Sequence, residues 1–504
     1  MNTIRKLRIF SMSNKSTIYN SINDPLLSEG SSPLLQEEVD VPTIQTSRIS
    51  DTNEEASTKS ILYNFVLFSI LFSANHGAVV SCLSLASARL GDLGTAQNSV
   101  LYLSYTLSAL FGSTYVIKTI GPFRSIIVGM SVYCIYILSY VVATTATESS
   151  MQTLKIVAII SGGFIGGIGG GFLWTAQGSY FASASEIHAR MILRLESSTN
   201  ITTGVDSDSD DNEIQTATTL FHMRKEKEQE VVKDSTSLFA GVFACIYLLL
   251  EVMMRLFSTF TIQVLNWTWE SVFAGYAFTA FLSTVLMSSM VNDVSVPQHD
   301  LDRVEVDTNL DHRQHESNDD REETEINSPP TTTQTDSKDT FNKATVTFRI
   351  QLQDRKMKYM FPICAVFGLS SVFMITFVNG EVLRISLNDK NSAYVGVLTS
   401  ITSATAGIMS IVFGFVSKRT GNATILIIGC MSFFMVIFLF MIIPNLDNWN
   451  IPLLTIVYFF QGIGRSTFEG ALRAEFALIF TEKEGAVSLS SLLPFLSSFF
   501  GDTG

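Results

Sequence analysis

The sequence is poor in charged residues. Asp, Glu, Lys and Arg make up 16% of its 504 residues, whereas hydrophobic residues make up 47% and Phe alone contributes 37. Soluble domains carry about 25% charged residues, so most of this chain is unsuited to water. The net charge of −13 is unevenly placed, because residues 292–340 hold 14 acidic and 4 basic side chains. The sequence has no cluster of basic residues of the kind that binds nucleic acids, so we expect no nucleic-acid partner.

Paired cysteines and catalytic motifs are also lacking. The five cysteines lie far apart, each within an apolar stretch, and none belongs to a CxxC or metal-ligand pattern. We interpret them as packing residues. His312 and His315 lie in an acidic polar segment with no cysteine nearby, so we expect no metal there. The sequence shows no nucleophile elbow, no P-loop and no carboxylate pair outside the polar segments, so we expect neither an enzyme nor a bound cofactor.

Long apolar runs, in contrast, are frequent. A helix needs about 20 apolar residues to cross a bilayer. Ten runs have about this length, and they lie at about 61–86, 96–117, 124–146, 153–182, 235–260, 269–291, 357–379, 392–416, 423–445 and 451–480. An eleventh begins near residue 487, and the sequence ends at Gly504. We therefore expect an all-α polytopic membrane protein whose chain is truncated in span 11.

The distribution of Lys and Arg predicts the orientation of the spans. With a cytosolic N-terminus, the inner segments hold 25 Lys and Arg residues and the outer segments hold four, as the positive-inside rule requires. The chain then divides into four parts, which are a disordered cytosolic tail (1–60), a six-helix half (61–291) with an inner loop insertion (183–234), an acidic cytosolic linker (292–356) and an incomplete C-terminal half (357–504). The sequon at Asn266 falls in an outer loop, where we expect glycosylation.

Two pairs of segments reveal an internal repeat. Residues 167–182 match 462–477 at six of 16 positions, and residues 116–129 match 416–429 at five of 14. Both pairs lie six spans apart with the same predicted orientation, which is typical of two parallel six-helix halves, as in the major facilitator superfamily. We therefore expect a major facilitator bundle with two six-helix pseudo-repeats. In this alignment Trp174 corresponds to Glu469, so the two should face each other across the bundle.

A loop motif is similar to one in the same superfamily. "GFVSKRTGN" (414–422) resembles the signature loop of the major facilitators, and Gly414, Arg419 and Gly421 match it. Lys418 stands where the family has Asp. The resemblance implies a loop whose charges latch the inner gate, and the Lys weakens that latch.

The stretch "GGFIGGIGGGFLWTAQGSYFA" (162–182) is similar to the fourth helix of the Unc-ninety-three-like branch of the major facilitators. The run Trp174–Tyr180 carries most of the match, and residues 73–112 resemble the branch's N-terminal module. The branch includes a channel regulatory subunit and an endosomal chaperone of receptors. The resemblance implies a multi-pass protein that regulates or traffics a partner channel or receptor. The alternative function is a proton-coupled secondary transporter of a small solute.

The N-terminal tail carries short sorting patterns. "YNSI" (19–22) and "DPLLSEGSSPLL" (24–35) resemble endolysosomal signals that adaptor proteins bind. We therefore expect the protein to lie in the lipid bilayer of an endolysosomal or vacuolar compartment, or in that of the plasma membrane. We also expect adaptor proteins to bind its N-terminal tail.

The glycines of the fourth predicted span recur at four-residue spacing. They are Gly162, Gly163, Gly166, Gly167, Gly170 and Gly171. Small residues at this spacing let a neighbouring helix approach closely. A dinucleotide-binding loop would need a GxGxxG motif after a strand, which is not found here. We therefore predict a helix-packing face.

Charged residues within predicted spans are the main candidates for function, because such residues are costly in lipid and often mark pathways. Glu251 and Arg255 lie in span 5, and Arg465, Glu469 and Arg473 lie four residues apart in span 10. Each Glu could simply neutralise an Arg on its own helix. For span 5 we leave both interpretations open. For span 10 we favour function, since one Arg exceeds the number of Glu partners at this spacing.

Four uncharged residues complete the set of cavity candidates. Asn75 and His76 lie in the middle of span 1, and Trp174 and Gln177 lie three residues apart on span 4. A histidine could carry a proton near neutral pH, although a buried polar residue in a membrane helix is more often a helix–helix contact.

Overall fold

The structure is a computed structural model that describes residues 45–146, 149–201, 213–294, 355–389 and 391–472. Residues 1–50 form a unit of their own, separate from the unit that begins at Asp51. Its described residues are helical or lie in short connections, and none forms a strand. The all-α prediction is confirmed for this part of the chain.

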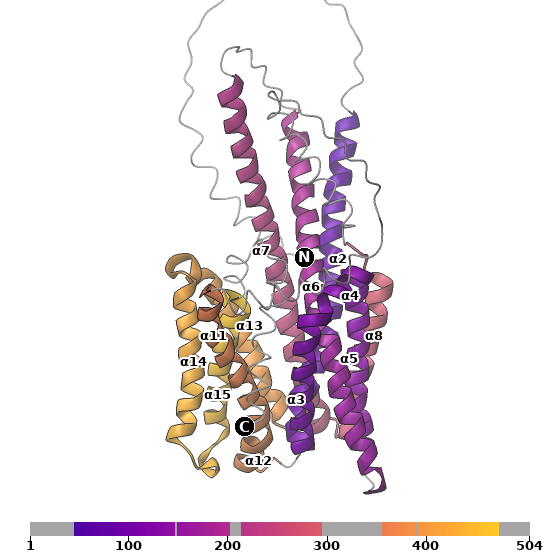
Figure 1. The fold of residues 1–504 in the computed structure, drawn as a ribbon, viewed down its shortest axis with the longest axis vertical. Helices are drawn as coiled ribbons and strands as arrows, with labels where there is room; N and C mark the ends of the chain where they lie inside the picture. The colour runs from indigo at the N-terminus through magenta and orange to yellow at the C-terminus, as the bar shows by residue number, and fades with distance from the viewer. Residues whose placement is uncertain (1–44, 147–148, 202–212, 295–354, 390, 473–504) are drawn as a thin grey trace, which may run out of the picture. The chain divides into compact units, whose positions relative to one another are not determined.

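The first group of helices, called the first half below, contains α2 (Gln45–Leu90), α3 (Asp92–Leu107), η1 (Ser108–Gly112), α4 (Ser113–Ile120), α5 (Pro122–Thr145), η2 (Ser149–Met151), α6 (Gln152–Ile201), α7 (Glu213–Gln263) and α8 (Trp269–Met290). The second half contains α11 (Arg355–Val372), η3 (Phe373–Val382), α12 (Leu383–Ser386), α13 (Val395–Thr420), α14 (Asn422–Ile442), η4 (Leu446–Asn448), α15 (Ile451–Thr467) and η5 (Phe468–Leu472). Figure 1 shows their arrangement. The turns η1, η3 and η5 are π-helical.

Eight helices of the described residues are long and apolar enough to cross a membrane. They coincide with eight of the ten predicted spans. The predicted span at 96–117 is not among them; in this stretch α3, the π-helical turn η1 and α4 follow one another. The predicted span at 451–480 is not among them either. Its helix α15 has 17 residues before the π-helical turn η5, and residues from 473 onward lie outside the described part.

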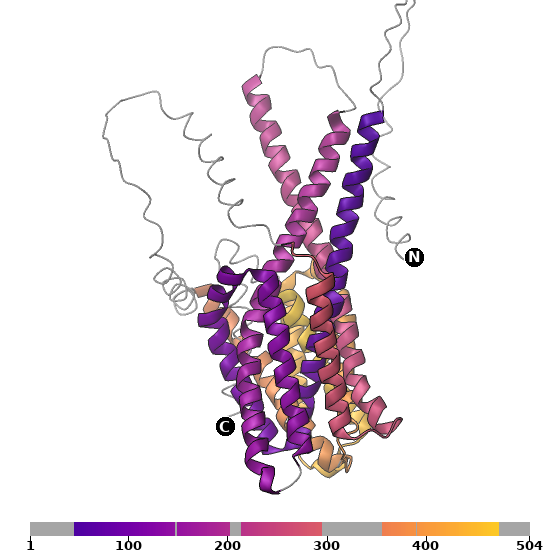
Figure 2. The same cartoon turned by 90° about the vertical axis from the view of Figure 1, so that its right-hand side faces the viewer.

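Helices α6 and α7 extend well beyond their predicted ends (Figure 2). We expected a loop insertion at 183–234, but α6 continues to Ile201 and α7 already begins at Glu213. Both extensions lack Gly and Pro, so nothing in the sequence stops the helices. Glu186 and Arg190 form an i,i+4 ion pair of 2.6 Å on α6. Helix α2 likewise begins at Gln45, within the tail that we expected to be disordered.

The internal repeat has a structural counterpart. Helix α6 packs on α3 and α5, as α15 packs on α13 and α14. Gly121 and Gly421, which are 300 residues apart, each join two helices with a positive φ, of 84° and 78°. A side chain other than Gly is strained at such angles. The same local geometry therefore recurs at equivalent positions, in agreement with the predicted pseudo-repeat.

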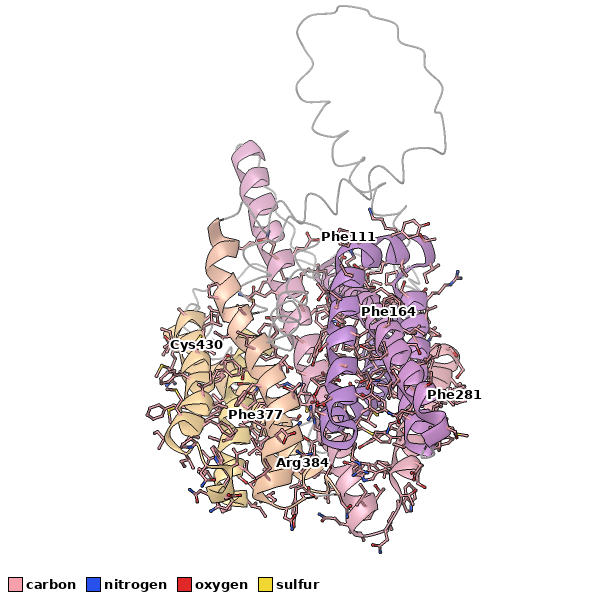
Figure 3. All side chains as sticks on the ribbon, turned by 60° about the horizontal axis from the view of Figure 1, so that its bottom comes forward. Phe111, Phe164, Phe281, Phe377, Arg384 and Cys430 are labelled. Atoms are coloured by element: carbon pink, nitrogen blue, oxygen red, sulfur yellow. The ribbon has the colours of Figure 1, made fainter. Side chains whose placement is uncertain are left out.

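The outer surface of the helices is strongly apolar. Phe111, Phe164 and Phe281 are 58%, 51% and 61% exposed (Figure 3). Apolar surface of this extent is unusual for a soluble monomer and marks a membrane-facing surface. Polar side chains lie instead inside the bundle, where 39 polar or charged residues of the described part are buried, Asn75, Glu251 and Arg255 among them. The protein thus has the inside-out polarity that a bilayer requires.

Candidate functional site

A cavity of about 230 Å³ lies between the two halves. Much of its wall is aromatic. The first half contributes Tyr102, Tyr105, Tyr133, Trp174 and Tyr247, and the second half contributes Phe367, Tyr458 and Phe468. Small-molecule pockets typically measure about 300–1,000 Å³, so this cavity suits a small solute. His76, Arg255, Arg465 and Glu469 also line it.

A buried ion pair joins the two halves beside this cavity. Glu251 on α7 is completely buried. Its two carboxylate oxygens accept hydrogen bonds of 2.7 Å from Nη1 and Nη2 of Arg465, 214 residues away on α15. Oε1 of Glu251 also accepts bonds of 3.0 and 2.8 Å from Nε and Nη2 of Arg255. One carboxylate thus holds two guanidinium groups, one from each half.

A second carboxylate completes what we call the charge cluster, defined as Glu251, Arg255, Arg465 and Glu469. Nε of Arg465 donates to Oε1 of Glu469 at 2.8 Å. The pairs within each helix are therefore both present, as the spacing of four residues allowed. The pair across the halves is additional, and the cluster as a whole is neutral.

Two serines that the sequence analysis did not single out support the charge cluster. Ser403 on α13 donates to Oε1 of Glu251 at 2.9 Å. Ser84 on α2 accepts from Nη1 of Arg255 at 3.0 Å. Serine is frequent in membrane helices, so no sequence signal distinguished these two from the others. They satisfy polar atoms that would be costly if left unpaired in the bundle.

His76 and Trp174 lie together at the wall of the cavity. The two ring centroids are 4.9 Å apart in an edge-to-face arrangement, and His76 also stacks on Tyr247 at 5.6 Å. His76 is only 8% exposed, and its Nδ1 atom has no hydrogen-bond partner among the described residues. The histidine is therefore held by ring packing and not by hydrogen bonds to Nδ1.

Asn75 and Gln177 do not belong to the cavity wall. Asn75 points away, and its Nδ2 donates to the carbonyl oxygen of Ala280 and to Oγ1 of Thr284, both at 3.1 Å. It therefore ties α2 to α8. Gln177 is buried but is not a lining residue. Arg473, the remaining charged candidate, lies outside the described residues.

The glycine-rich stretch lies where α6 crosses α3 and α5. A Cβ atom on Gly163 or Gly171 would stand 2.8 Å from the carbonyl oxygen of Gln97 or Tyr105 on α3. The same face includes Gly167. Gly162 and Gly166 face α5, where a Cβ on Gly166 would stand 2.9 Å from Tyr136. A Cβ on Gly170 would stand 2.7 Å from the hydroxyl of Tyr133 and 2.9 Å from the ring of Tyr105. Both neighbours of α6 thus approach its backbone directly.

The halves also meet at the end of the bundle that carries Leu90, Gln263 and Ser386, which the Lys and Arg distribution predicts to face away from the cytosol. We call it the outer end. Two hydrogen bonds cross between the halves there, from Ser392 to the carbonyl of Ala88 (3.2 Å) and from Thr259 to the carbonyl of Ala393 (2.9 Å). A third, from Asn379 Nδ2 to the carbonyl of Ser84 (3.2 Å), crosses at the cavity wall, which both residues line. A Cβ on Gly380 would stand 3.3 Å from that of Ser87.

Asn379 was missed by the sequence analysis, although a signal was available. It is a buried amide within a membrane span, and its Oδ1 accepts a 2.6 Å hydrogen bond from the hydroxyl of Tyr458. Such residues are rare in lipid and usually have a partner. We took residue 379 as the end of the span, whereas the helical stretch continues through η3 to Ser386.

The loop signature lies at the junction of α13 and α14. Gly421 is the positive-φ residue between the two helices. Arg419 is exposed and makes no ion pair with any other described residue. Gly414 has no atom near the position of a Cβ among the described residues.

Asn266 is exposed in the short connection between α7 and α8, with a φ of 51°. We predict that expression in a eukaryotic host adds one N-linked glycan at this residue, because the sequon is accessible on the predicted outer side. Digestion with a glycosidase should then increase gel mobility, and Asn266→Gln should abolish the shift. Asn422→Gln, in a sequon on the predicted inner side, is the control. A glycan at Asn422 would contradict the orientation.

Comparisons with known proteins agree with this geometry. The sequence profile described as "Major Facilitator Superfamily" matches residues 232–501. The fold is similar to that of the xylose transporter XylE from E. coli in a partially occluded inward open conformation, with a TM-score of 0.52 and 11% identity over 88% of this chain and 90% of that one. It is also similar to a single-residue mutant of the peptide transporter POT in complex with alafosfalin, with a TM-score of 0.51 and 11% identity over 88% and 86%. The search of curated proteins gave no match.

Proposed function

The chain belongs to the Major Facilitator Superfamily, and from this we propose that it is a secondary transporter that binds a small solute in its central cavity. One observation carries the proposal. The cavity is lined by both halves, so a solute bound there touches both at once. Relative movement of two halves around a site at their interface is the general basis of alternating access.

The position of the contacts between the halves supports the same function. The hydrogen bonds of Ser392 and Thr259 join the halves at the outer end. The Asn379–Ser84 hydrogen bond joins them at the cavity wall, and the Glu251–Arg465 pair joins them beside the cavity. Such contacts would have to open for a solute to reach the cavity from the outer side. In this conformation the outer end is therefore the closed gate.

A second function, the regulation or escort of a partner channel or receptor, is favoured by a different observation. The run Trp174–Tyr180 resembles the Unc-ninety-three-like branch. In addition, Arg419 of the loop signature has no ion-pair partner among the described residues, and Lys418 stands in place of an Asp. An incomplete latch at the inner gate suits a protein that does not alternate.

A disulfide across the outer end tests the two functions against each other. The Cβ positions of Ser87 and Gly380 are 3.3 Å apart, close to the range of about 3.5–4.5 Å found in disulfides. We predict that Ser87→Cys combined with Gly380→Cys forms a disulfide spontaneously. Uptake of solutes by proteoliposomes, screened with a broad library with and without a proton gradient, should then fall to background and recover with reductant.

Each single cysteine variant is the control and should transport normally. A protease site inserted between residues 295 and 354 shows whether the disulfide has formed, because the cleaved halves then stay together on a non-reducing gel. Undiminished uptake in the cross-linked protein would contradict alternating access. Absence of uptake of every solute by the wild type, together with capture of a channel or receptor by the cross-linked protein, would favour the second function.

A further inference from the structure

We propose that the central cavity selects an organic cation, a protonated amine with a small apolar or aromatic body, and that Glu469 binds the amine. This inference rests on the proposed function, since it names the solute class of the same cavity. The solute class follows from the polar atoms of the cavity wall that are still able to bind a ligand.

The two arginines of the cavity are already engaged. All three nitrogens of Arg255 donate hydrogen bonds, to Glu251 and Ser84. All three nitrogens of Arg465 donate as well, to Glu251, Ser403 and Glu469. The two guanidinium charges are therefore already balanced by two carboxylates, and an anionic ligand would add an uncompensated negative charge to a neutral buried cluster.

The two carboxylates differ from each other. Both oxygens of Glu251 accept hydrogen bonds from arginines, and its side chain is 0% exposed. Glu469 accepts through Oε1 only, and its side chain is 21% exposed. Within the described part of the chain, Oε2 of Glu469 has no hydrogen-bond partner. Oε2 of Glu469 is thus a negatively charged hydrogen-bond acceptor that a ligand can use, and it suits an ammonium group.

The aromatic wall favours the same ligand charge. A cation is attracted to the face of an aromatic ring, most strongly to that of Trp. Trp174, Tyr133 and Tyr247 line the cavity from the first half, and Phe367 and Phe468 from the second. Trp174 and Glu469 occupy equivalent positions of the internal repeat, so each half places one cation-binding group on this wall.

Local helix geometry presents Glu469 to the cavity. The residue lies in the π-helical turn η5 (Phe468–Leu472), and π-helical turns are frequent at functional sites. Phe468 stacks on Phe367 with ring centroids 3.9 Å apart and planes within 1°. This stacking anchors the turn, and the hydrogen bond from Nε of Arg465 holds the Glu469 side chain at the wall.

A series of three ligands with one body tests the inference. Phenethylamine, 2-phenylethanol and phenylacetate share a benzene ring and differ in charge. We expect calorimetry on the purified protein to show phenethylamine binding at least tenfold more tightly than 2-phenylethanol, and phenylacetate binding weakest. Glu469→Gln should weaken phenethylamine about ten- to hundredfold, as expected for the loss of a charged hydrogen bond, and leave 2-phenylethanol unchanged.

Glu381→Gln is a matched control, because Glu381 also lies in a π-helical turn and pairs with an arginine, Arg384, but is exposed. It should bind all three ligands as the wild type does. Tighter binding of phenylacetate than of phenethylamine, or equal affinity of Glu469→Gln for the amine, would overturn the inference, even if vesicles take up other solutes. Binding of phenethylamine that depends on Glu469, without any uptake, would support the cation site and contradict transport. If Glu469→Gln does not fold, the ligand order on the wild type still decides.

Discussion

Glu251→Gln is expected to lower the free energy of unfolding by about 3–5 kcal/mol, the usual cost of removing one partner from a buried ion pair. The reason is that Arg255 and Arg465 share this one carboxylate, which is completely buried. A neutral amide can accept a hydrogen bond but cannot balance two guanidinium charges. Thermal unfolding of the detergent-solubilised protein measures the effect.

Glu381→Gln serves as the comparison for this change too. The Glu381–Arg384 pair is 2.7 Å long, like the buried one, but its side chains are 49% and 56% exposed. Exposed pairs contribute about 0–1 kcal/mol. Combining Glu251→Gln with Arg465→Gln should destabilise by less than the sum of the single changes, because the two side chains are coupled. Equal losses for Glu251→Gln and Glu381→Gln would show that the buried pair is not a structural link between the halves.

Gly167→Val is expected to prevent correct packing of α6, with a loss of about 3 kcal/mol or more. A Cβ atom at this position would overlap the carbonyl oxygen of Leu101 and the side chain of Ser104, and would stand 2.8 Å from the backbone nitrogen of Tyr105. Since two of these atoms belong to the backbone, a rotamer change cannot relieve the overlap. Size-exclusion chromatography of the solubilised protein should show little monodisperse material.

Gly241→Ala is the control for this substitution. Gly241 lies within α7, and apart from its chain neighbours and the adjacent backbone of α7 itself, no described atom lies within 4 Å of the position of its Cβ. Alanine should therefore gain about 0.5–1 kcal/mol of helix stability there. If Gly167→Val were as well folded as Gly241→Ala, the close approach of α3 to α6 would be wrong.

Those parts of the fold that depend on local chemistry could be predicted from the sequence. The length of the apolar runs located eight spans, because a bilayer imposes the same minimum length on every helix. The glycines of 162–182 indicated a packing face, although the sequence could not say that α3 and α5 share it. The extensions of α6 and α7 were missed, because a polar stretch without Gly or Pro was interpreted as a loop when its helical propensity should have been weighed.

The contacts within each helix of the site could be predicted from the sequence, but the contacts between helices could not. A spacing of four residues was enough to pair Glu251 with Arg255 and Arg465 with Glu469. The bond between Glu251 and Arg465 depends on how α7 and α15 approach each other over 214 residues, which no local pattern encodes. Asn379 could have been found from its place in an apolar run. Ser84 and Ser403 could not, because serine is tolerated throughout membrane helices.

The pairing of charges within each helix has a consequence for how the protein is made. Glu251 and Arg255 are synthesised more than 200 residues before Arg465 and Glu469. During translation α7 therefore enters the bilayer with its charge already balanced, and α15 does so later in the same way, which reduces the insertion cost of both helices. Docking of the second half then turns two separate neutral pairs into one network. Neither half therefore exposes an unpaired charge to the lipid before the two halves pack together.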